Sequence, residues 1–344
     1  MERATRSVRR MRSGAAATAA LLILLGPAAL PAAAAERPQK AFAIHDKRIT
    51  ESSGLTASRA HPGVYWTHND SDDGPYVYAV DSEGRTVATV TLRGIKPRDV
   101  EAVSLGPDGR LYVGDIGDNL DGTWPEVWIY AFAEPAELRD QTVTAARYKV
   151  RYEDGPRDAE ALMVHPVTGR AYIASKKQSG GGLYQGPEVL SPSGVNTFRR
   201  IADVPWVTDG AFSPDGGRLV LRGYFSADLY AWDGAPKKLR SLDVPFQRQG
   251  ESVTFSADGS AVLYGSEGEG SDVWRLALNG SPAPEAQGSA GPSASGAPGA
   301  ASGPAASDDS DGAAGGSDHA LAALIAVAAA IGLAKLWSGR RKSG

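Results

Sequence analysis

A short pattern that begins with an acidic residue occurs five times in this chain, and it restricts the fold more than any other sequence feature. Successive acids are separated by 50, 59, 49 and 42 residues. The five copies are Glu51-Ser-Ser-Gly-Leu, Glu101-Ala-Val-Ser-Leu, Glu160-Ala-Leu-Met-Val, Asp209-Gly-Ala-Phe-Ser and Glu251-Ser-Val-Thr-Phe. Self-similarity with this period is typical of WD40-like β-propellers, in which each repeat supplies one four-stranded blade.

The residues that follow each acid show the same order of strand and turn signals. In the second copy, the turn Pro107-Asp-Gly precedes two runs of β-branched and aromatic residues, 111–114 and 127–131, which predict strands. Outer strands are expected at 86–92, 142–152, 198–201 and 238–242. The fifth copy lacks an outer strand, and the segment 41–49 lies ahead of the first copy. The sequence therefore predicts an all-β, five-bladed β-propeller closed by this N-terminal strand. Six blades are the alternative, because the second repeat is long.

Composition changes sharply at both ends of the repeat region. Arginines at the N-terminus precede an apolar segment and Ala33-Ala34-Ala35, a pattern typical of a secretory signal peptide and its cleavage site. Near the C-terminus, residues 320–337 would form a helix of about 27 Å, enough to span a bilayer. The expected organisation is a signal peptide (1–35), the propeller (36–280), a disordered linker rich in Pro, Ala, Gly, Ser and Asp (281–318), a transmembrane helix (319–337) and a basic cytoplasmic tail (338–344).

This organisation predicts a single-pass membrane protein with its N-terminus and propeller on the extracellular face and its C-terminus in the cytoplasm. The chain has no cysteine, which excludes disulfides, thiol nucleophiles and cysteine-bound zinc. Its formal net charge of −4 gives no general attraction to nucleic acid, so we expect no nucleic-acid partner, and we expect a monomer. No Gly-x-Ser-x-Gly, P-loop or His-Glu-x-x-His motif occurs, so the catalytic residues, if any, are unknown.

The five repeat acids are the candidate metal ligands. In a propeller the first strand of every blade lines the central channel, so these acids would converge on one axis. Like charges at close range require a cation, basic side chains or shared protons. Carboxylate oxygens without Cys and with little His favour Ca²⁺ or Mg²⁺, and a wide ring favours Ca²⁺. The predicted metal ligands are Glu51, Glu101, Glu160, Asp209 and Glu251. The alternative is that Lys176 and Arg222 neutralise the acids.

A second group of polar residues follows the second strand of each blade. Because strand two runs antiparallel to strand one, its end should lie beside the repeat acid. Two copies of Pro-Arg-Asp-x-Glu, at 97–101 and 156–160, also place a second carboxylate on the same side of the strand as the acid, and Arg98 and Arg157 are candidate ion-pair partners. The predicted ligand-binding residues are Asn69, Asp70, Asp99, Asp115, Asp118, Asn119, Asp158, Lys176, Lys177, Arg222 and Glu267.

Phrases spread over residues 50–270 resemble a family of secreted bacterial β-propellers. They include Glu51-Ser-Ser-Gly-Leu, Thr67-His-Asn-Asp-Ser, Gly114-Asp-Ile-Gly-Asp-Asn, Gln249-Gly-Glu and Ser266-Glu-Gly. One acid per blade is also similar to the five-bladed calcium-activated nucleotidases (apyrases), whose axial channel holds Ca²⁺ with Glu and Ser residues from successive blades. That resemblance implies Ca²⁺ at the five repeat acids, although an acid at all five positions departs from the apyrase pattern. The acid-rich loops give a more distant similarity to phytase-like propellers.

Two functions are compatible with these features. The first is a binding or scaffold module, in which a divalent cation stiffens the channel and the loops contact a small anionic ligand or a protein. The second is a metal-dependent hydrolase of phosphoesters, with Lys176, Lys177 or Arg222 holding an anion. Cationic side chains that point freely into the channel mouth would favour the hydrolase, and ion pairs there would favour the binding module.

Overall fold

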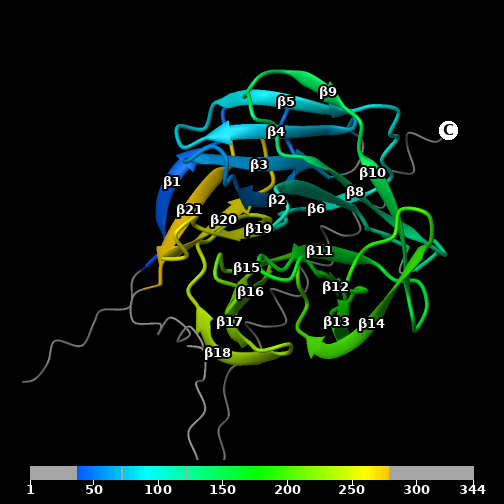
Figure 1. Cartoon of the computed structure of the whole chain (residues 1–344). Coiled ribbons are helices and arrows are strands. Elements are labelled where there is room, and N and C mark those ends of the chain that lie inside the picture. Colours follow the sequence, from blue (N-terminus) through cyan, green and yellow to red (C-terminus); the bar gives the residue numbers. More distant parts are fainter. Residues whose placement is uncertain (1–36, 71–72, 121, 279–344) are drawn as a thin grey trace, which may run out of the picture. The chain divides into compact units, whose positions relative to one another are not determined.

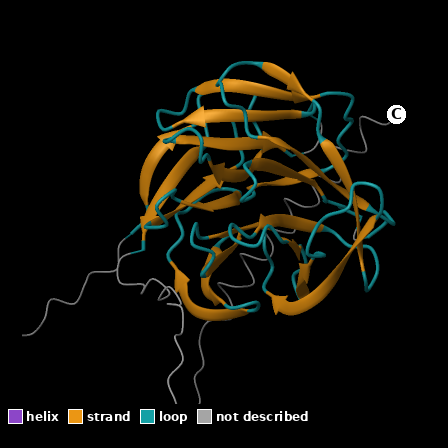
Figure 2. Ribbon diagram, in the orientation of Figure 1, coloured by secondary structure: helices purple, strands orange, loops and turns teal. Residues whose placement is uncertain are grey.

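The chain folds as an all-β protein. In the computed structural model, residues 37–70, 73–120 and 122–278 are described, and every regular element within these ranges is a β-strand (Figure 2). Across the same ranges, no helix has the length and apolar character needed to cross a membrane. The predicted signal peptide (1–35) and C-terminal helix (319–337) lie outside the described residues.

The strands follow the predicted repeats, and consecutive strands within a repeat pair antiparallel (Figure 1). Repeat 1 contains β2 (Ser52–Ala57), β3 (Val64–Asn69), β4 (Tyr76–Asp81) and β5 (Thr86–Leu92). Repeat 2 contains β6 (Val100–Leu105), β7 (Arg110–Asp115), β8 (Val127–Ala133) and β10 (Ala146–Tyr152). Repeat 3 contains β11 (Ala159–Val164), β12 (Ala171–Ser175), β13 (Gly181–Gln185) and β14 (Val195–Val204). Repeat 4 contains β15 (Asp209–Phe212), β16 (Arg218–Gly223), β17 (Ser226–Trp232) and β18 (Pro236–Leu242).

The N-terminal strand completes the last repeat, as predicted. Repeat 5 contains β19 (Gly250–Phe255), β20 (Ala261–Ser266) and β21 (Asp272–Ala277), and β1 (Gln39–Ala43) is its fourth strand. β1 pairs antiparallel with β21, so the first and last strands of the described region lie in one sheet. This pairing covers the edge that β21 would otherwise expose. The strand starts earlier than predicted and ends at Ala43 rather than at residue 49.

The predicted outer strand at 142–152 is divided between two sheets. β9 (Gln141–Val143) pairs parallel with β5 of repeat 1, whereas β10 pairs with β8 of its own repeat. The chain therefore crosses between sheets at residues 144–145. β10 also pairs parallel with β14, which joins repeats 2 and 3 into one eight-stranded sheet. This sheet is nearly closed, because its terminal strands β6 and β11 contact each other.

The first strands of the repeats form a closed series, and we call β2, β6, β11, β15 and β19 the inner strands. Each contacts the inner strand of the next repeat, and β19 contacts β2. Five apolar clusters fill the spaces between successive repeats, and one of them packs Leu55 and Tyr78 of repeat 1 against Leu263 and Val273 of repeat 5. Burial of apolar surface between sheets therefore holds the repeats together around a common centre.

The inner strands all present the same end to the same side. Each begins near its repeat acid and ends in a tight turn, as at Gly109 (φ 68°) and Gly259 (φ 69°), where the positive φ favours glycine. One cavity is lined by residues from the C-terminal parts of all five inner strands. We call this side the turn end of the channel that the inner strands surround, and the side with the repeat acids the acid end.

Candidate functional site

Three acidic side chains meet at the acid end, close enough to hold one metal ion. Asp70 follows β3, Asp99 precedes β6, and Glu101 is the second residue of β6. One carboxylate oxygen from each of the three lies within 4.8 Å of the others. All three are buried, with 4%, 4% and 2% of their surfaces exposed. Three oxygen donors at this spacing are suited to a hard divalent cation.

Neighbouring residues fix the orientation of two of these carboxylates. The Asn119 side-chain amide donates a hydrogen bond to Asp99 Oδ2 (2.8 Å), and the Ser53 hydroxyl donates to Glu101 Oε2 (3.3 Å). Gly117 lies directly against both acids. An added Cβ at Gly117 would be 2.5 Å from Asp99 Oδ2 and 2.6 Å from Glu101 Oε1. The close approach of the two carboxylates to this loop therefore depends on glycine at this position.

The electrostatic environment disfavours ionisation of Asp99 and Glu101 in the absence of a cation. Burial raises the pKa of Asp99 strongly, and the nearby Asp70 carboxylate raises it further. Burial also raises the pKa of Glu101 well above its usual range, with further contributions from Asp70 and Glu160. Lys176 acts on Glu101 in the opposite direction. The three carboxyls must share protons or a positive ion, because three adjacent buried anions repel one another.

The arginines of the duplicated Pro-Arg-Asp-x-Glu motif do not neutralise the acids of that motif. Arg98 stacks between the rings of Trp124 (4.0 Å) and Trp128 (3.6 Å), and its ion pair, at 3.9 Å, is with Asp115. In the second copy, Arg157 pairs with Asp154 and lies over Tyr184. These arginines support the loops from outside, through cation–π contacts.

In repeat 3, a lysine outside the motif pairs with the glutamate of the motif. Lys176 Nζ forms an ion pair with Glu160 Oε1, and both side chains are largely buried. Burial alone would lower the pKa of Lys176, but Glu160 and the other nearby anionic groups outweigh it and raise the pKa well above 10.5. The backbone N–H of Lys176 donates a hydrogen bond to the Asp158 carbonyl at 3.0 Å. The ammonium group therefore satisfies in repeat 3 the charge that Glu160 introduces.

In repeat 2, Gly117 makes the backbone hydrogen bond that Lys176 makes in repeat 3. The backbone N–H of Gly117 donates to the Asp99 carbonyl at 3.2 Å, and the backbone N–H of Lys176 donates in the same way to the Asp158 carbonyl. The preceding residue, Ile116, is fully buried in the apolar cluster between repeats 2 and 3. In repeat 3 this hydrogen bond thus comes from a lysine whose side chain contacts Glu160, and in repeat 2 it comes from a glycine packed against Asp99 and Glu101.

The remaining repeat acids do not join the group of three. Asp209 accepts hydrogen bonds from the backbone N–H groups of Gly210 (2.7 Å) and Val253 (2.8 Å). Glu251 accepts one from the Gln249 side chain at 3.0 Å. Glu51 is half-buried and directly precedes β2. Within the ranges that the structure describes, the group that could hold a metal contains Glu101 together with Asp70 and Asp99, and none of Glu51, Glu160, Asp209 and Glu251.

Arg222 holds the backbone from a fully buried position. It is fully buried, and its Nη1 donates to the carbonyls of Ser252 (2.7 Å) and Gly265 (2.8 Å). Its Nη2 donates to Gln247 Oε1 at 2.6 Å. Burial lowers its pKa to about 10, although the guanidinium remains charged at neutral pH. Arg222 therefore connects repeats 4 and 5.

Several predicted ligand-binding residues instead shape the loops. Asp115 accepts from the N–H groups of Asp99 (3.0 Å) and Arg98 (3.2 Å) and from the Tyr130 hydroxyl (3.0 Å), so it positions the start of β6. Asp118 accepts from the Thr123 hydroxyl and the Trp124 N–H, and its own N–H donates to Asp158 Oδ1 at 2.8 Å. These bonds hold the loop that carries Gly117 and Asn119 against the acids.

The other predicted residues lie around the rim of the acid end. Asn69 ties the segment before β2 to β3, because its Oδ1 accepts from the N–H groups of Thr50 and Glu51 at 3.0 Å each. Lys177 is exposed, and Glu267 is half-buried beside Gln249. The sequence analysis did not identify Ser53 and Gly117 as site residues. The signal that was available for Gly117 was its place inside the Gly114–Asn119 phrase.

Comparison with known proteins does not assign the chain to a family. No family model matches the sequence, and a search of curated proteins finds no significant match.

Proposed function

We propose that this chain is a five-bladed β-propeller that binds one divalent cation, Ca²⁺, through Asp70, Asp99 and Glu101 and acts as a binding or scaffold module. The closed series of inner strands and the five apolar clusters between repeats support the blade count. The predicted signal peptide and C-terminal helix place the module on the outer face of the membrane.

The equivalence of Gly117 and Lys176 carries the metal proposal. Both copies of the motif present an Asp and a Glu, and in repeat 3 the Lys176 ammonium contacts the Glu. In repeat 2 the residue that makes the same backbone hydrogen bond is Gly117, which is packed against Asp99 and Glu101 and brings no charge to them. A bound cation would supply there the charge that lysine supplies in repeat 3. An all-oxygen donor set matches Ca²⁺, which accepts irregular geometry more readily than Mg²⁺.

The arrangement of cationic side chains favours a binding module over a phosphoester hydrolase. Lys176 is committed to Glu160, and the Arg222 guanidinium is buried among backbone carbonyls. Neither side chain is available to stabilise the charge that develops on a transferred phosphoryl group. The metal in this proposal stiffens the loops of the acid end, which then contact a partner.

Thermal unfolding of the full-length chain tests the proposal. The protein is first treated with EDTA, and Ca²⁺ or Mg²⁺ is then restored. At ~100 times the dissociation constant, a ligand specific for the folded state adds about 2.7 kcal/mol, or roughly 5–10 °C in Tm for a domain of this size. We expect this rise with Ca²⁺ in the wild type and in Glu137→Gln, an exposed control, and its loss in Glu101→Gln. No rise with any divalent ion would exclude the metal.

A further inference from the structure

The turn end of the channel contains a cavity lined by an arginine and by hydroxyl-bearing residues, whereas the acid end carries carboxylates. Its volume is about 70 Å³, and residues from all five inner strands line it. This is room for a few water molecules or one small ion, and too little for a nucleotide. The hydroxyl-bearing residues Thr56, Ser104 and Thr254 contribute to the lining, each from a different repeat. The repeat acids lie near the opposite ends of these strands, roughly 15 Å away along a strand.

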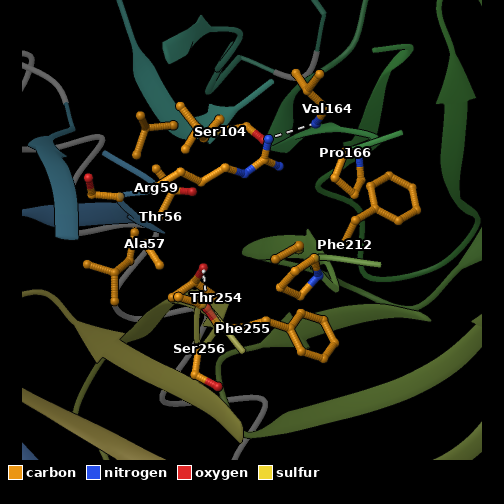
Figure 3. A pocket seen from close by; sticks show the side chains of 18 residues that line it. Thr56, Ala57, Arg59, Ser104, Val164, Pro166, Phe212, Thr254, Phe255 and Ser256 are labelled. Atoms are coloured by element: carbon orange, nitrogen blue, oxygen red, sulfur yellow. Dashed lines mark hydrogen bonds between the residues drawn. The ribbon is translucent and has the colours of Figure 1, made fainter. Parts of the chain in front are cut away.

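Arg59 brings a positive charge to this cavity. It lies in the turn after β2, and its side chain extends across the cavity toward Ser104 and Val164, with Thr254 and Phe212 on the other side (Figure 3). Its Nη1 donates to the Gly106 carbonyl at 3.2 Å. Among the described residues it has no carboxylate partner. A guanidinium has five N–H donors, so most of its hydrogen-bonding capacity remains available.

Glu134, a carboxylate that contacts the residues on both sides of Arg59, is already committed to other groups. Glu134 accepts hydrogen bonds from the Ser58 hydroxyl (2.6 Å), the Trp66 indole N–H (2.8 Å) and, more weakly, the Ala60 N–H (3.4 Å). On the cavity wall, the Ser104 hydroxyl oxygen accepts from the Val164 N–H at 2.9 Å. That bond uses the oxygen as acceptor and leaves the Ser104 hydroxyl proton free to donate.

We propose that the turn end of the channel binds a small oxyanion, held by Arg59 and by the hydroxyls of Ser104 and Thr56. A guanidinium pairs with two oxygens of a carboxylate or phosphate, and hydroxyl donors complete the set. The ligand is a free oxyanion that fits the small cavity. This inference is independent of the metal at the acid end, because the two sites share no residue.

Isothermal titration of the full-length chain with inorganic phosphate, and separately with acetate, tests the inference. The titrations are carried out in EDTA, so that a metal at the acid end cannot contribute. We expect saturable binding of at least one of the two anions. Arg59→Gln should weaken binding about tenfold or more, because it removes a charge-assisted hydrogen bond, and Thr56→Val should weaken it less. Arg199→Gln, which removes an exposed arginine from β14, should leave the affinity unchanged.

Two results would overturn this inference. One is the absence of saturable binding of either anion by the wild type. The other is equal affinity in Arg59→Gln and wild type, which would place the anion elsewhere on the protein. Circular dichroism of each variant checks that the fold is retained, and Thr56→Val provides a second test if Arg59→Gln fails to fold. Loss of the Ca²⁺ effect in the thermal experiment would leave this binding unchanged.

Discussion

Replacing Lys176 with methionine tests the charge balance of the acid end directly. Methionine retains most of the apolar length of the lysine side chain and removes the ammonium group that contacts Glu160. In the pair, 15% of the Lys176 side chain and 2% of the Glu160 side chain are exposed. Removing one partner of a buried ion pair costs about 3–5 kcal/mol, because the other charge is left without compensation. Since 15% of the Lys176 side chain remains exposed, we expect the lower end of this range, a loss of about 3 kcal/mol at pH 8.

The loss should depend on pH in a defined direction. In the wild type the pKa of Lys176 is raised above 10.5, so its stabilising contribution is fully present at pH 5–8 and is lost only as the pH rises beyond that range. In Lys176→Met, protonation of Glu160 at low pH removes the uncompensated charge. The difference between variant and wild type should therefore be smaller at pH 5 than at pH 8. Up to ~1.4 kcal/mol can change for each pH unit.

Urea unfolding of the full-length chain in EDTA, at pH 5 and pH 8, provides the measurement. The double variant Lys176→Met/Glu160→Gln removes both charges and should recover most of the stability lost at pH 8. Lys177→Met is the matched control, since this neighbouring lysine is exposed, and it should change the free energy of unfolding by less than about 0.5 kcal/mol. A loss below about 1 kcal/mol for Lys176→Met at pH 8, or an equal loss at both pH values, would refute the reasoning.

Three further predictions concern the metal site, the pH dependence and the closure of the fold. Gly117→Ala should reduce the Ca²⁺-dependent rise in Tm, because the added Cβ would lie 2.6 Å from Glu101 Oε1, and an unchanged rise would contradict the metal position. Burial lowers the pKa of His165, whose Nδ1 accepts a hydrogen bond from the Thr168 N–H, so stability should fall as the pH drops below about 6.5. Urea midpoints at pH 5 and 7 check this, and His165→Gln should show a smaller difference between them. Deleting residues 37–43 exposes the edge of β21 and removes the buried Phe42, so Tm measured by circular dichroism should fall by at least about 5 °C.

Much of the fold could be predicted because the repeat pattern is local. Alternating apolar residues and turn glycines define the first three strands of each repeat, and the absence of a fourth strand after β21 indicated that an N-terminal strand completes the sheet. The division of 142–152 into β9 and β10 could not be predicted. Both pieces have strand composition, and which sheet each one joins depends on parallel pairing with β5 and β14, strands distant in the sequence.

The position of the candidate site could be predicted from the sequence, but the residues that form it could not. The repeat acids do lie at one end of the inner strands, as the antiparallel topology requires. By strand register, Ile116 corresponds to Lys176, since Val100 pairs with Asp115 as Ala159 pairs with Ser175. The structure buries Ile116 in the core and gives the corresponding backbone N–H to Gly117. This shift by one residue places Gly117 rather than Ile116 beside Asp99 and Glu101, and no sequence pattern indicates it.

The charge balance around Glu101 and Glu160 depends more on the residue beside each acid than on the acids themselves. Glu101 and Glu160 are equivalent in strand position, burial and motif. They differ in the residue whose N–H reaches the carbonyl of the preceding Asp: a glycine in repeat 2 and a lysine in repeat 3. Lysine brings a permanent charge to Glu160, whereas glycine brings none to Glu101, whose charge balance then depends on protons or a cation from the solution. A protein held outside the cell, as we propose for this chain, could thus respond to Ca²⁺ in repeat 2 while repeat 3 keeps its charge balance regardless of the metal.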